Sequence, residues 1–442
     1  MTLQSSLDRL KQRLKCGQSE SSTAPSPVRT IPLQQAFYDF DLFPEYKTFT
    51  TMQWYYDKEK YSRNQFITHV GSSDATVNLD GREVINFSSY NYLSLAFDDR
   101  VRQAAKDAID ELGTSTGSGR SITGEVTLHQ EFEREIAAVL GTEDAVVSVG
   151  GYSTNAFALG YLARQQDLIV YDELIHNSAL AGCRLSGARR FSFPHNDYEA
   201  LDQLLTRERS GYERVIILVE GVYSMDGDIP NLPRIIQIKH RHHALLMVDE
   251  AHSMGVIGPR GLGATDYFRI DGREIDIHYG SMSKAFGTCG GYVAGRKSLV
   301  AILKNYAPGV LLYGAAPTPA NTAAGLQSLR IMQQEPERSA RVRSNAAYFI
   351  QQAHAVGLDT GPSKDSGVIP VMMPDSEVAL WLSIQLFDAG ICTFPMLYPI
   401  VPRDKSRLRF FINTNHTQEQ IDLTIRTLRQ NLDRAPKSKG VF

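Results

Sequence analysis

Residues 244–253 read Ala-Leu-Leu-Met-Val-Asp-Glu-Ala-His-Ser, a short apolar run that ends at an acid. A run of this kind, bounded by polar residues, is typical of a buried strand in a parallel sheet. Placing the carboxylate of Asp249 at the end of such a run is costly unless it faces a cationic partner. The stretch therefore predicts a strand that delivers an acid to a ligand.

The same pattern recurs along the chain from about residue 84. Short apolar runs of high strand propensity alternate with amphipathic stretches at 99–112, 126–140 and 153–164. The runs lie at 145–149, 167–171, 189–193, 215–219, 244–248 and 292–295. This alternation predicts an α/β fold with a mostly parallel central sheet covered by helices on both faces.

The flanking segments differ from this repeating pattern. After about residue 310 a long helical pattern (319–356) precedes a helix at 376–389 and a strand-like run at 407–413, which indicates a smaller C-terminal α+β lobe. We expect a large domain at 84–309 and a small domain at 310–442.

The N-terminal part divides into a tail and an arm. Residues 1–15 carry leucines at helical spacing, so a short amphipathic helix is one interpretation and a frayed tail the other. Residues 16–30 have the composition of a linker, and we expect the whole tail to span 1–30. Residues 31–83 carry too many aromatic residues for a disordered segment and are expected to form an arm that packs on another surface.

Composition excludes several classes of protein. The 442 residues are 42% hydrophobic and 21% charged with a net charge of -3, so we expect no nucleic-acid partner. The four cysteines are far apart and form no C-x-x-C pair, which disfavours a zinc site or a disulfide framework and fits a reducing cytoplasm. The long charge-free runs at 145–163 and 305–329 contain Gly or Pro, so we predict no membrane span.

The loops that follow the predicted strands carry unusual chemistry. In parallel α/β sheets, ligands bind where these loops converge. Gly150 and Gly151 precede a helix whose free N–H groups favour a phosphate, although chain direction alone also explains a glycine turn. His176 follows the run at 167–171, although a single histidine is more often a packed or surface residue.

A lysine is the fourth group of the predicted ligand site, after Asp249, the helix start at Gly151 and His176. Residues 280–287 read Gly-Ser-Met-Ser-Lys-Ala-Phe-Gly, and an amine among such small and apolar neighbours loses water, lowers its pKa and becomes a nucleophile. Lys284, the acid Asp249, the ring of His176 and the helix-start phosphate site match the four needs of pyridoxal 5'-phosphate (PLP). Together they predict a PLP site.

Three rival motifs are weaker. Ser281 to Lys284 fits the S-x-x-K pattern of serine acyl-transferring enzymes, but the S-D-N and K-T-G elements are absent. Residues 113–117 fit G-x-S-x-G, yet they follow a helical pattern instead of a strand. Residues 240–243, His-Arg-His-His, close a basic helical stretch and are better explained as a helix C-terminus than as a metal site, so we expect no metal.

Over roughly residues 80–430 the chain resembles the α-oxoamine synthases, a family of PLP enzymes with the type I aminotransferase fold. The resemblance rests on several long motifs, and locally it is nearest to the serine palmitoyltransferase branch and to polyketide-associated synthases. These motifs are SYNYLSL, TGSGRSITG, DELIHNSALAGCRLSGA, HND, LVEGVYSMDGDIPNL, VDEAHSMGVIGPRGLG, GSMSKAFGTCGGYVAG and RLRF.

The resemblance implies a role for each matching residue. Lys284 would form the Schiff base with PLP, Asp249 would pair with the pyridine nitrogen, and His176 would stack on the ring. Arg409 would grip the carboxylate of an amino acid, a bidentate task that suits guanidinium. The remaining assignments are Ser224 and His252 near the phenolic oxygen, and Gly151, Tyr152 and Ser281 at the phosphate.

The resemblance also implies a reaction and partners. The family condenses an amino acid with an acyl thioester, on coenzyme A or on an acyl-carrier protein, and releases carbon dioxide to give an α-amino ketone. A homodimer is implied. The N-terminal extension suggests docking of an acyl-carrier protein, and the alternative is an arm that only completes the dimer surface. An aminotransferase or amino-acid lyase of the same fold, or a non-catalytic subunit of a synthase, remains as an alternative.

Two positions depart from the family pattern. Gly314, Ala315 and Ala316 stand where the partner chain commonly offers hydroxyls to the phosphate, so part of that cradle is altered. Tyr90 occupies a place often held by asparagine near the substrate carboxylate. Neither position specifies the amino acid or the length of the acyl chain.

Overall fold

The computed structural model describes residues 31–58, 66–398 and 400–436, and it divides into two compact units between residues 62 and 63. The helix and linker predicted within residues 1–30 lie outside the described residues. Each unit is considered by itself, and the second carries all of the predicted site residues.

The first unit is a short helical segment. It contains the 3-10 turns η1 (Gln35–Phe37) and η2 (Phe40–Leu42) and the helix α2 (Pro44–Lys58), and the Asp39 side chain caps η2 by accepting from the Asp41 N–H. The rings of Phe40 and Phe43 pack together at 5.0 Å. Several aromatic side chains are nevertheless exposed within this unit, among them Tyr38, Phe40 and Phe49.

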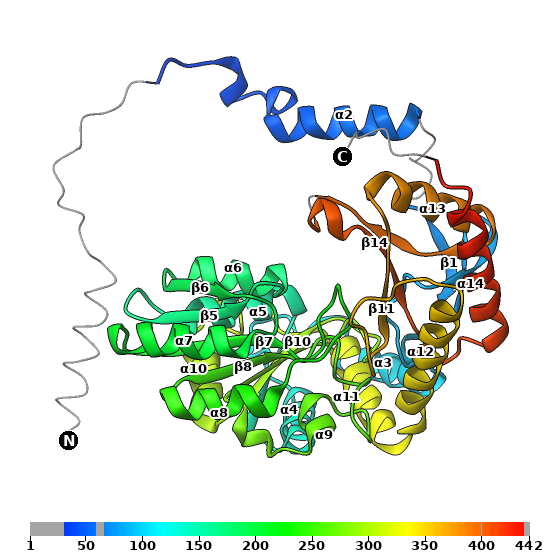
Figure 1. Cartoon of the computed structure of the whole chain (residues 1–442). Helices are drawn as coiled ribbons and strands as arrows, with labels where there is room; N and C mark the ends of the chain where they lie inside the picture. The colour runs from blue at the N-terminus through cyan, green and yellow to red at the C-terminus, as the bar shows by residue number, and fades with distance from the viewer. Residues whose placement is uncertain (1–30, 59–65, 399, 437–442) are drawn as a thin grey trace, which may run out of the picture. The chain divides into compact units, whose positions relative to one another are not determined.

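The second unit is built on a seven-stranded sheet with the order β4-β10-β9-β8-β7-β5-β6 (Figure 1). All strands run parallel except β10, which is antiparallel to both β4 and β9, so the predicted mostly parallel sheet is confirmed. The strands are β4 (Asp144–Ser148), β5 (Leu168–Asp172), β6 (Arg189–Phe193), β7 (Val215–Glu220), β8 (Leu245–Asp249), β9 (Ile277–Ser281) and β10 (Gly291–Gly295).

Helices cover both faces of this sheet because its strands are apolar on both sides. Along β7, Ile216 and Leu218 belong to one buried cluster, whereas Ile217 and Val219 belong to another, as the two-residue period of a strand requires. The helices of this part are α3 (Asp99–Leu112), α4 (Thr127–Leu140), α5 (Gly151–Leu162), α6 (Asn177–Leu185), α7 (Tyr198–Glu208), α8 (Leu232–His242), α9 (Ala264–Phe268) and α10 (Lys297–Tyr306).

A second part of this unit, here called the C-terminal part although it includes residues 69–86, contains two smaller sheets. A three-stranded sheet has the order β11-β14-β13, and a four-stranded sheet has the order β1-β2-β3-β12. The parallel pairing of β3 with β12 puts residues 69–86 in one sheet with residues 391–392. The strands are β1 (His69–Ser73), β2 (Thr76–Leu79), β3 (Arg82–Asn86), β11 (Val368–Met372), β12 (Ile391–Cys392), β13 (Phe394–Met396) and β14 (Arg407–Phe411).

Four further helices follow in the chain. One, α11 (Pro319–Gln334), packs on α3 and α4 of the large part, whereas α12 (Glu337–Ala355), α13 (Ser376–Asp388) and α14 (Gln418–Leu432) belong to the C-terminal part. The long helical pattern at 319–356 is therefore two helices, which break at Glu335 and Pro336. Proline removes a backbone donor and clashes with the preceding turn, which explains the break.

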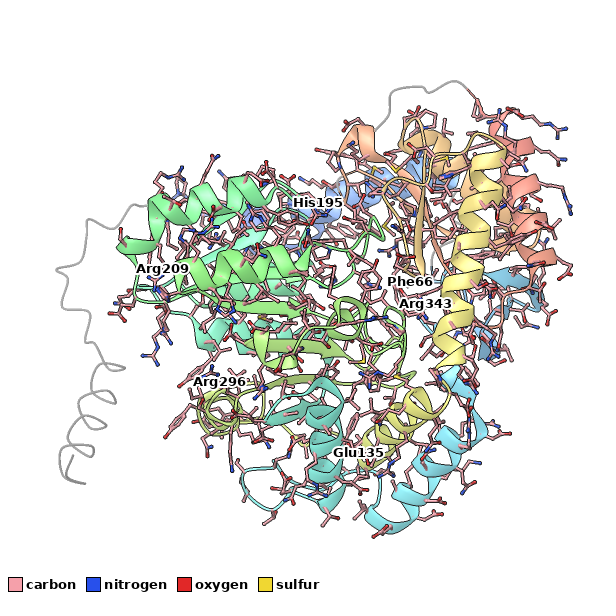
Figure 2. The ribbon with its side chains drawn as sticks, turned by 60° about the horizontal axis from the view of Figure 1, so that its bottom comes forward. Phe66, Glu135, His195, Arg209, Arg296 and Arg343 are labelled. Carbon is pink, nitrogen blue, oxygen red and sulfur yellow. The ribbon has the colours of Figure 1, made fainter. Side chains whose placement is uncertain are left out.

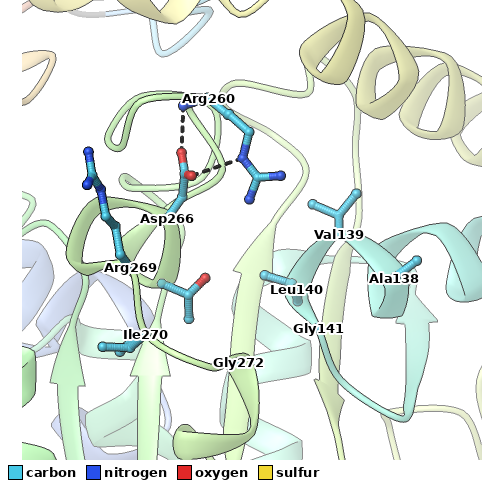
Figure 3. Close-up of a pocket in the computed structure, with 10 residues that line it drawn as sticks. Ala138, Val139, Leu140, Gly141, Arg260, Asp266, Arg269, Ile270 and Gly272 are labelled. Atoms are coloured by element: carbon cyan, nitrogen blue, oxygen red, sulfur yellow. Dashed lines mark hydrogen bonds and ion pairs between the residues drawn. The ribbon is translucent and has the colours of Figure 1, made fainter.

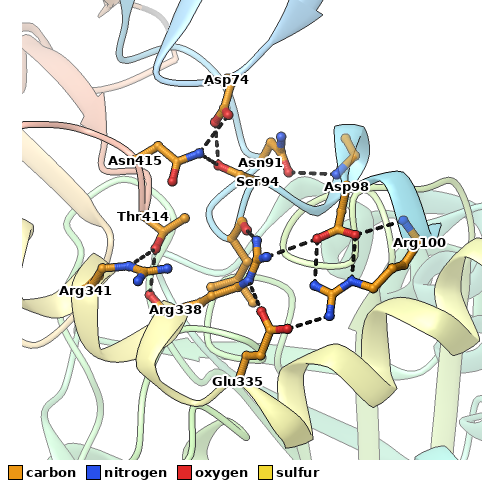
Figure 4. A network of polar contacts seen from close by, with 12 residues as sticks. Asp74, Asn91, Ser94, Asp98, Arg100, Glu335, Arg338, Arg341, Thr414 and Asn415 are labelled. Atoms are coloured by element: carbon orange, nitrogen blue, oxygen red, sulfur yellow. Dashed lines mark hydrogen bonds and ion pairs between the residues drawn. The ribbon is translucent and has the colours of Figure 1, made fainter. Parts of the chain in front are cut away.

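A polar network holds this break against α3 (Figure 4). Asp98 accepts from the Arg100 N–H at the start of α3 and also pairs with Arg338 at 3.0 Å. Glu335 accepts from both Arg100 and Arg338. The junction of α11 and α12 is therefore fixed to the large part of the unit by charge-assisted hydrogen bonds.

Within the described residues, no helix is both long enough and apolar enough to cross a membrane.

Candidate active site

A cavity of about 290 Å³ opens at the carboxyl ends of the parallel strands. Residues that follow β5, β7, β8 and β9 line it, and Arg409 from β14 together with Tyr90 closes it from the C-terminal part. The lining is Tyr90, Tyr152, His176, Ser178, Glu220, Ser224, Met225, Asp249, Ala251, His252, Tyr279, Ser281, Ser283, Lys284 and Arg409.

Lys284 enters the cavity from the turn after β9. The turn closes when the Gly287 N–H donates to the Lys284 carbonyl at 2.9 Å, and Gly287 has a φ of +65°, which favours glycine. Burial lowers the pKa of the Lys284 amine to about 8, although the charges of Asp249 and Glu220 oppose that shift. A substantial share of the amine is therefore neutral near pH 8, as a nucleophile or base requires.

Asp249 ends β8 on the floor of the cavity. Its carboxylate accepts from the Asn155 side chain at 3.0 Å and from the Ala251 N–H at 3.0 Å. Burial raises the pKa of Asp249, and the nearby Lys284 ammonium and these donors oppose the rise. A buried carboxylate with two donors still needs a cationic partner, which agrees with the sequence prediction.

Two histidines, His176 and His252, line the cavity. The Nδ1 atom of His176 is 2.7 Å from the Ser178 hydroxyl, and its ring meets Tyr152 edge to face. Partial burial, with the charges of Lys284 and Arg409, lowers the pKa of His176 to about 4. Burial likewise lowers the pKa of His252, so both rings are neutral at pH 7.

His252 is held by contacts with the C-terminal part. Its Nδ1 atom is 2.8 Å from the Tyr92 hydroxyl, and its ring is parallel to that of Phe411 within 9° at a centroid distance of 6.1 Å. Phe411 in turn stacks under the guanidinium of Arg409 at 4.6 Å. The ring of Phe411 therefore lies next to both the imidazole of His252 and the guanidinium of Arg409.

Arg409 presents donors to the cavity. One Nη1 hydrogen bond of 2.9 Å goes to the Ser224 carbonyl, while the buried Nε atom has no hydrogen-bond partner among the described residues. A buried donor without an acceptor is costly. Because Arg409 lines the cavity, its guanidinium is available to a ligand carboxylate.

The start of α5 provides an anion site. Gly150 caps this helix without a side-chain hydrogen bond, so its first N–H groups stay open. A Cβ at Gly151 would lie 2.5 Å from the Ser281 Oγ, so the helix end and that hydroxyl approach as closely as glycine permits. The Ser281 Oγ is also 2.9 Å from the Ser283 Oγ, which adds a second hydroxyl.

These groups fit PLP. The uncapped start of α5 with Ser281 suits the phosphate, the Asp249 carboxylate suits a protonated ring nitrogen, and the Lys284 amine suits the aldehyde. The unpartnered Nε of Arg409 suits the carboxylate of an amino acid.

The structure brings nearly all of the predicted residues together. Lys284, His176, Asp249, His252, Ser224, Ser281, Tyr152 and Arg409 line the cavity, and Gly151 adjoins it through Ser281. Sequence reasoning did not select Glu220, Asn155 or Ser178. Glu220 carries the same signal as Asp249, because it also ends an apolar run.

The altered segment at 314–316 lies beside the glycine-rich loop at 116–124. The Ala316 N–H donates to the Ser118 carbonyl at 3.3 Å, and a Cβ at Gly119 would lie 2.9 Å from the Gly314 carbonyl. Gly314 has open space on its Cβ side, and the neighbouring Tyr313 is 92% exposed. These residues do not line the cavity of their own chain.

A second cavity, of about 370 Å³, lies away from this chemistry, where α4 ends beside α9 (Figure 3). Its one carboxylate, Asp266, pairs with Arg260 at 3.1 Å, and Arg269 lies on its exposed rim. Because Asp266 is already bound by Arg260, this cavity offers no free carboxylate for catalysis.

The histidines at 240–243 lie at the end of α8, as the helix C-terminus interpretation expects. His240 bonds Glu274 at 2.6 Å, and His242 bonds Asp202 at 2.7 Å. Within the described ranges there is no group of three or more side chains suited to hold a metal ion.

Comparison with known proteins adds independent findings. A family model described as aminotransferase class I and II matches residues 82–428. An 8-amino-7-oxononanoate synthase from Thermosipho melanesiensis is 38% identical over 364 residues, covering 82% of this chain and 91% of the relative. Another from Fervidobacterium nodosum is 39% identical over 354 residues, covering 79% of this chain and 89% of the relative.

Solved structures agree with these relatives. A serine palmitoyltransferase from S. paucimobilis, with a bound PLP-myriocin adduct, superposes with a TM-score of 0.84 at 28% identity, covering 89% of this chain and 98% of that one. The serine palmitoyltransferase of Sphingomonas wittichii has a TM-score of 0.84 at 26% identity, with coverages of 90% and 100%.

Proposed function

The chain belongs to the α-oxoamine synthases, PLP-dependent acyltransferases that condense an amino acid with an acyl thioester and release carbon dioxide, and on that premise we propose that the cavity around Lys284 is its active site. The observation that supports this best is that Lys284, Asp249 and Arg409 line one cavity. They supply an amine for the cofactor, a counter-charge for its ring and a cation for the substrate.

When bound, PLP supplies an electron sink for the carbanion of the amino acid. Asp249 would keep a proton on the pyridine nitrogen, because a cation at that position would stabilise its buried carboxylate. The ring of His176, which is neutral at pH 7, would cover one face of the cofactor. The start of α5 and the Ser281 hydroxyl hold the phosphate.

Lys284 moves the proton of the reaction. Burial lowers the pKa of its amine to about 8, so the amine accepts the α-proton of the amino acid and later returns it. Arg409 orients the substrate through its carboxylate, with its own position set by the Ser224 carbonyl and the ring of Phe411. Ser224 and the neutral His252 line the cavity and would donate hydrogen bonds to the phenolic oxygen of the cofactor.

Absorption spectroscopy tests this assignment. The wild-type chain incubated with PLP should show a visible band from the lysine-bound cofactor, and Lys284→Ala should lose that band together with all condensation activity. Each amino acid is added singly with an acyl thioester, and the released carbon dioxide and free thiol are measured. The condensation should release the two in equal amounts. Keto-acid release without thiol release would instead support an aminotransferase.

We also infer that the chain is a homodimer whose partner completes the phosphate site. The exposed Tyr313 and Ile122, at 92% and 79%, lie on the two neighbouring segments 311–319 and 116–124, and large exposed apolar side chains favour an interface. Tyr313→Asp should then shift the sedimentation coefficient from dimer to monomer and weaken PLP binding. A wild-type chain that sediments as a monomer would contradict this inference.

The N-terminal arm suggests an acyl-carrier protein as the source of the thioester. Phe40 and Phe49 are 79% and 54% exposed in the first unit, so they offer apolar surface to a partner. Replacing both by serine should raise KM for carrier-bound thioesters and leave KM for coenzyme A thioesters unchanged. Removal of residues 1–30 tests the tail separately, and cell fractionation tests the expected cytoplasmic location.

A further inference from the structure

His195 lies between two acids just outside the active-site cavity. It belongs to the connection between β6 and α7, and it is labelled in Figure 2. Its Nδ1 atom is 2.9 Å from the Asp172 Oδ1, and its Nε2 atom is 2.8 Å from the Asp228 Oδ2. The side chains of Asp172 and Asp228 are 1% and 10% exposed, so this three-residue cluster is largely removed from water.

The geometry requires a charged imidazole. Both ring nitrogens face carboxylate oxygens, and only the imidazolium donates from both. Burial lowers the pKa of His195, but the hydrogen bonds and charges of Asp172 and Asp228 outweigh it and raise the pKa to about 10. The Oδ2 atom of Asp228 also accepts from the Asn196 side chain at 2.7 Å, and its Oδ1 atom is buried without a hydrogen-bond partner among the described residues, so the imidazolium is the cation that balances its charge.

One acid anchors the loop that presents His176. Asp172 ends β5, and its carboxylate accepts from the Leu174 N–H at 3.0 Å. Its backbone carbonyl accepts from the Ile175 N–H at 3.1 Å. His176 follows Ile175 directly and lines the cofactor cavity. The position of its ring therefore depends on how Asp172 is held.

The other acid closes the turn that carries Ser224. The Tyr223 N–H donates to the Asp228 carbonyl at 3.0 Å, which ties the two ends of the turn together. The ring of Tyr223 meets the ring of His195 edge to face at 4.5 Å. Ser224, in the same turn, lines the cavity and offers its carbonyl to Arg409.

The far side of this turn is fixed to the C-terminal part. Arg407 donates to the Met225 carbonyl at 3.0 Å and to the Asp226 carboxylate at 2.6 Å. The Ser366 hydroxyl donates to the Gly227 carbonyl at 2.7 Å, and a Cβ at Gly227 would collide with the backbone of β11. The C-terminal part therefore holds one side of the turn, and His195 holds the other.

We propose that His195 is a positioning residue that joins the loop of His176 to the turn of Ser224, and so sets the separation of the two walls that hold the cofactor and Arg409. The inference deepens the proposed function and rests on it. Without the positive ring, the buried carboxylates of Asp172 and Asp228 keep only neutral donors and repel each other, so the two walls separate.

His195→Gln tests the proposal in the full-length, cofactor-loaded enzyme. Glutamine keeps an amide donor but removes the charge. At a temperature well below unfolding, KM for the amino acid should rise about tenfold, because Arg409 loses its fixed position, while kcat changes less. The Kd of PLP, measured by titrating the apoenzyme, should rise about fivefold, since His176 and Ser224 move apart.

Charge rescue separates this role from simple packing. The double variant His195→Gln with Asp228→Asn removes the uncompensated carboxylate, so it should recover a large part of the lost affinity for PLP and for the amino acid. His240→Gln is the matched control, because His240 also pairs with a carboxylate but lies on α8, away from the cavity. It should leave both constants unchanged.

Several outcomes would overturn the proposal. These are KM and Kd of His195→Gln within about twofold of wild type, a double variant worse than the single one, or equal effects at His240. If His195→Gln does not fold, Asp228→Asn alone carries the test, and unchanged constants there would refute it. A wild-type chain that binds PLP without condensation activity would contradict the proposed function. The Kd of PLP does not depend on turnover, so it tests the role of His195 separately from the proposed function.

Discussion

Glu220 and Asp249 end adjacent parallel strands as register partners, and both carboxyl groups are buried in the cavity that Lys284 enters. Burial raises the pKa of each acid, and the charge of Asp249 raises that of Glu220 further. Two adjacent acids resist simultaneous ionisation. Because Asp249 has the additional donors Asn155 and Ala251, we assign the anion to Asp249 and the proton to Glu220.

This assignment predicts that Glu220→Gln stabilises the apoenzyme in a pH-dependent way. Since the folded chain holds the Glu220 proton more tightly than the unfolded chain, wild-type stability falls as pH rises above the ordinary glutamate pKa of about 4.3. Glutamine does not titrate. The Tm of Glu220→Gln should therefore exceed that of wild type by more at pH 8 than at pH 5.

Differential scanning calorimetry of the cofactor-free proteins measures this difference. Glu213→Gln, at an exposed position, serves as the control and should show no pH-dependent gain. The same Tm difference at both pH values would show that Glu220 ionises normally in the folded chain.

Asp249→Asn should separate charge from shape. Asparagine is nearly isosteric but carries no charge, so it cannot stabilise a protonated ring nitrogen. We expect kcat to fall about 100-fold, equivalent to about 2.7 kcal/mol of transition-state stabilisation, and PLP to bind more weakly. Steady-state kinetics and PLP titration measure the two effects, and a variant with normal kcat would exclude Asp249 as the partner of the ring.

The sequence predicts most of the sheet because burial on both faces leaves a plain apolar signal. The run at 215–219 becomes β7 and the run at 244–248 becomes β8. By contrast, β9 was not predicted, because Ile-His-Tyr-Gly-Ser at 277–281 interrupts its apolar residues with a histidine and a glycine. The antiparallel direction of β10 depends on tertiary pairing and leaves no mark in its residues.

The site residues also divide into those that the sequence predicts and those that only the fold reveals. Asp249 and Lys284 stand in local contexts that are chemically unusual, so each is recognisable from its neighbours in the chain alone. Asn155 and His195 act through partners 94 and 33 residues away, Asp249 and Asp228 respectively. No local pattern reports contacts of that separation, and only the fold brings these residues together.

Arg409→Lys should weaken binding of the amino acid more than it slows turnover. Lysine keeps the charge but loses the planar fork that contacts the Ser224 carbonyl and a carboxylate together. Loss of a charge-assisted hydrogen bond of about 1.5–3 kcal/mol should raise KM by roughly 10- to 100-fold, with a smaller change in kcat. Arg209→Lys is the control, since Arg209 also donates to backbone carbonyls but belongs to η5 (Arg209–Gly211), outside the cavity (Figure 2). An equal rise in KM for both variants would contradict the assignment.

Gly151→Ala should weaken phosphate binding through space alone. The added Cβ would lie 2.5 Å from the Ser281 Oγ and 3.1 Å from its Cβ, so either the hydroxyl or the start of α5 must move. Because the phosphate needs both, the Kd of PLP should rise about tenfold, while Gly211→Ala, with open space around its Cβ, should leave it unchanged. Adding Ser281→Gly to Gly151→Ala removes the collision but also the hydroxyl, so it should restore only part of the affinity. Full restoration would show that the Ser281 hydroxyl does not contact the phosphate, and an unchanged Kd in the single variant would place the phosphate away from the start of α5.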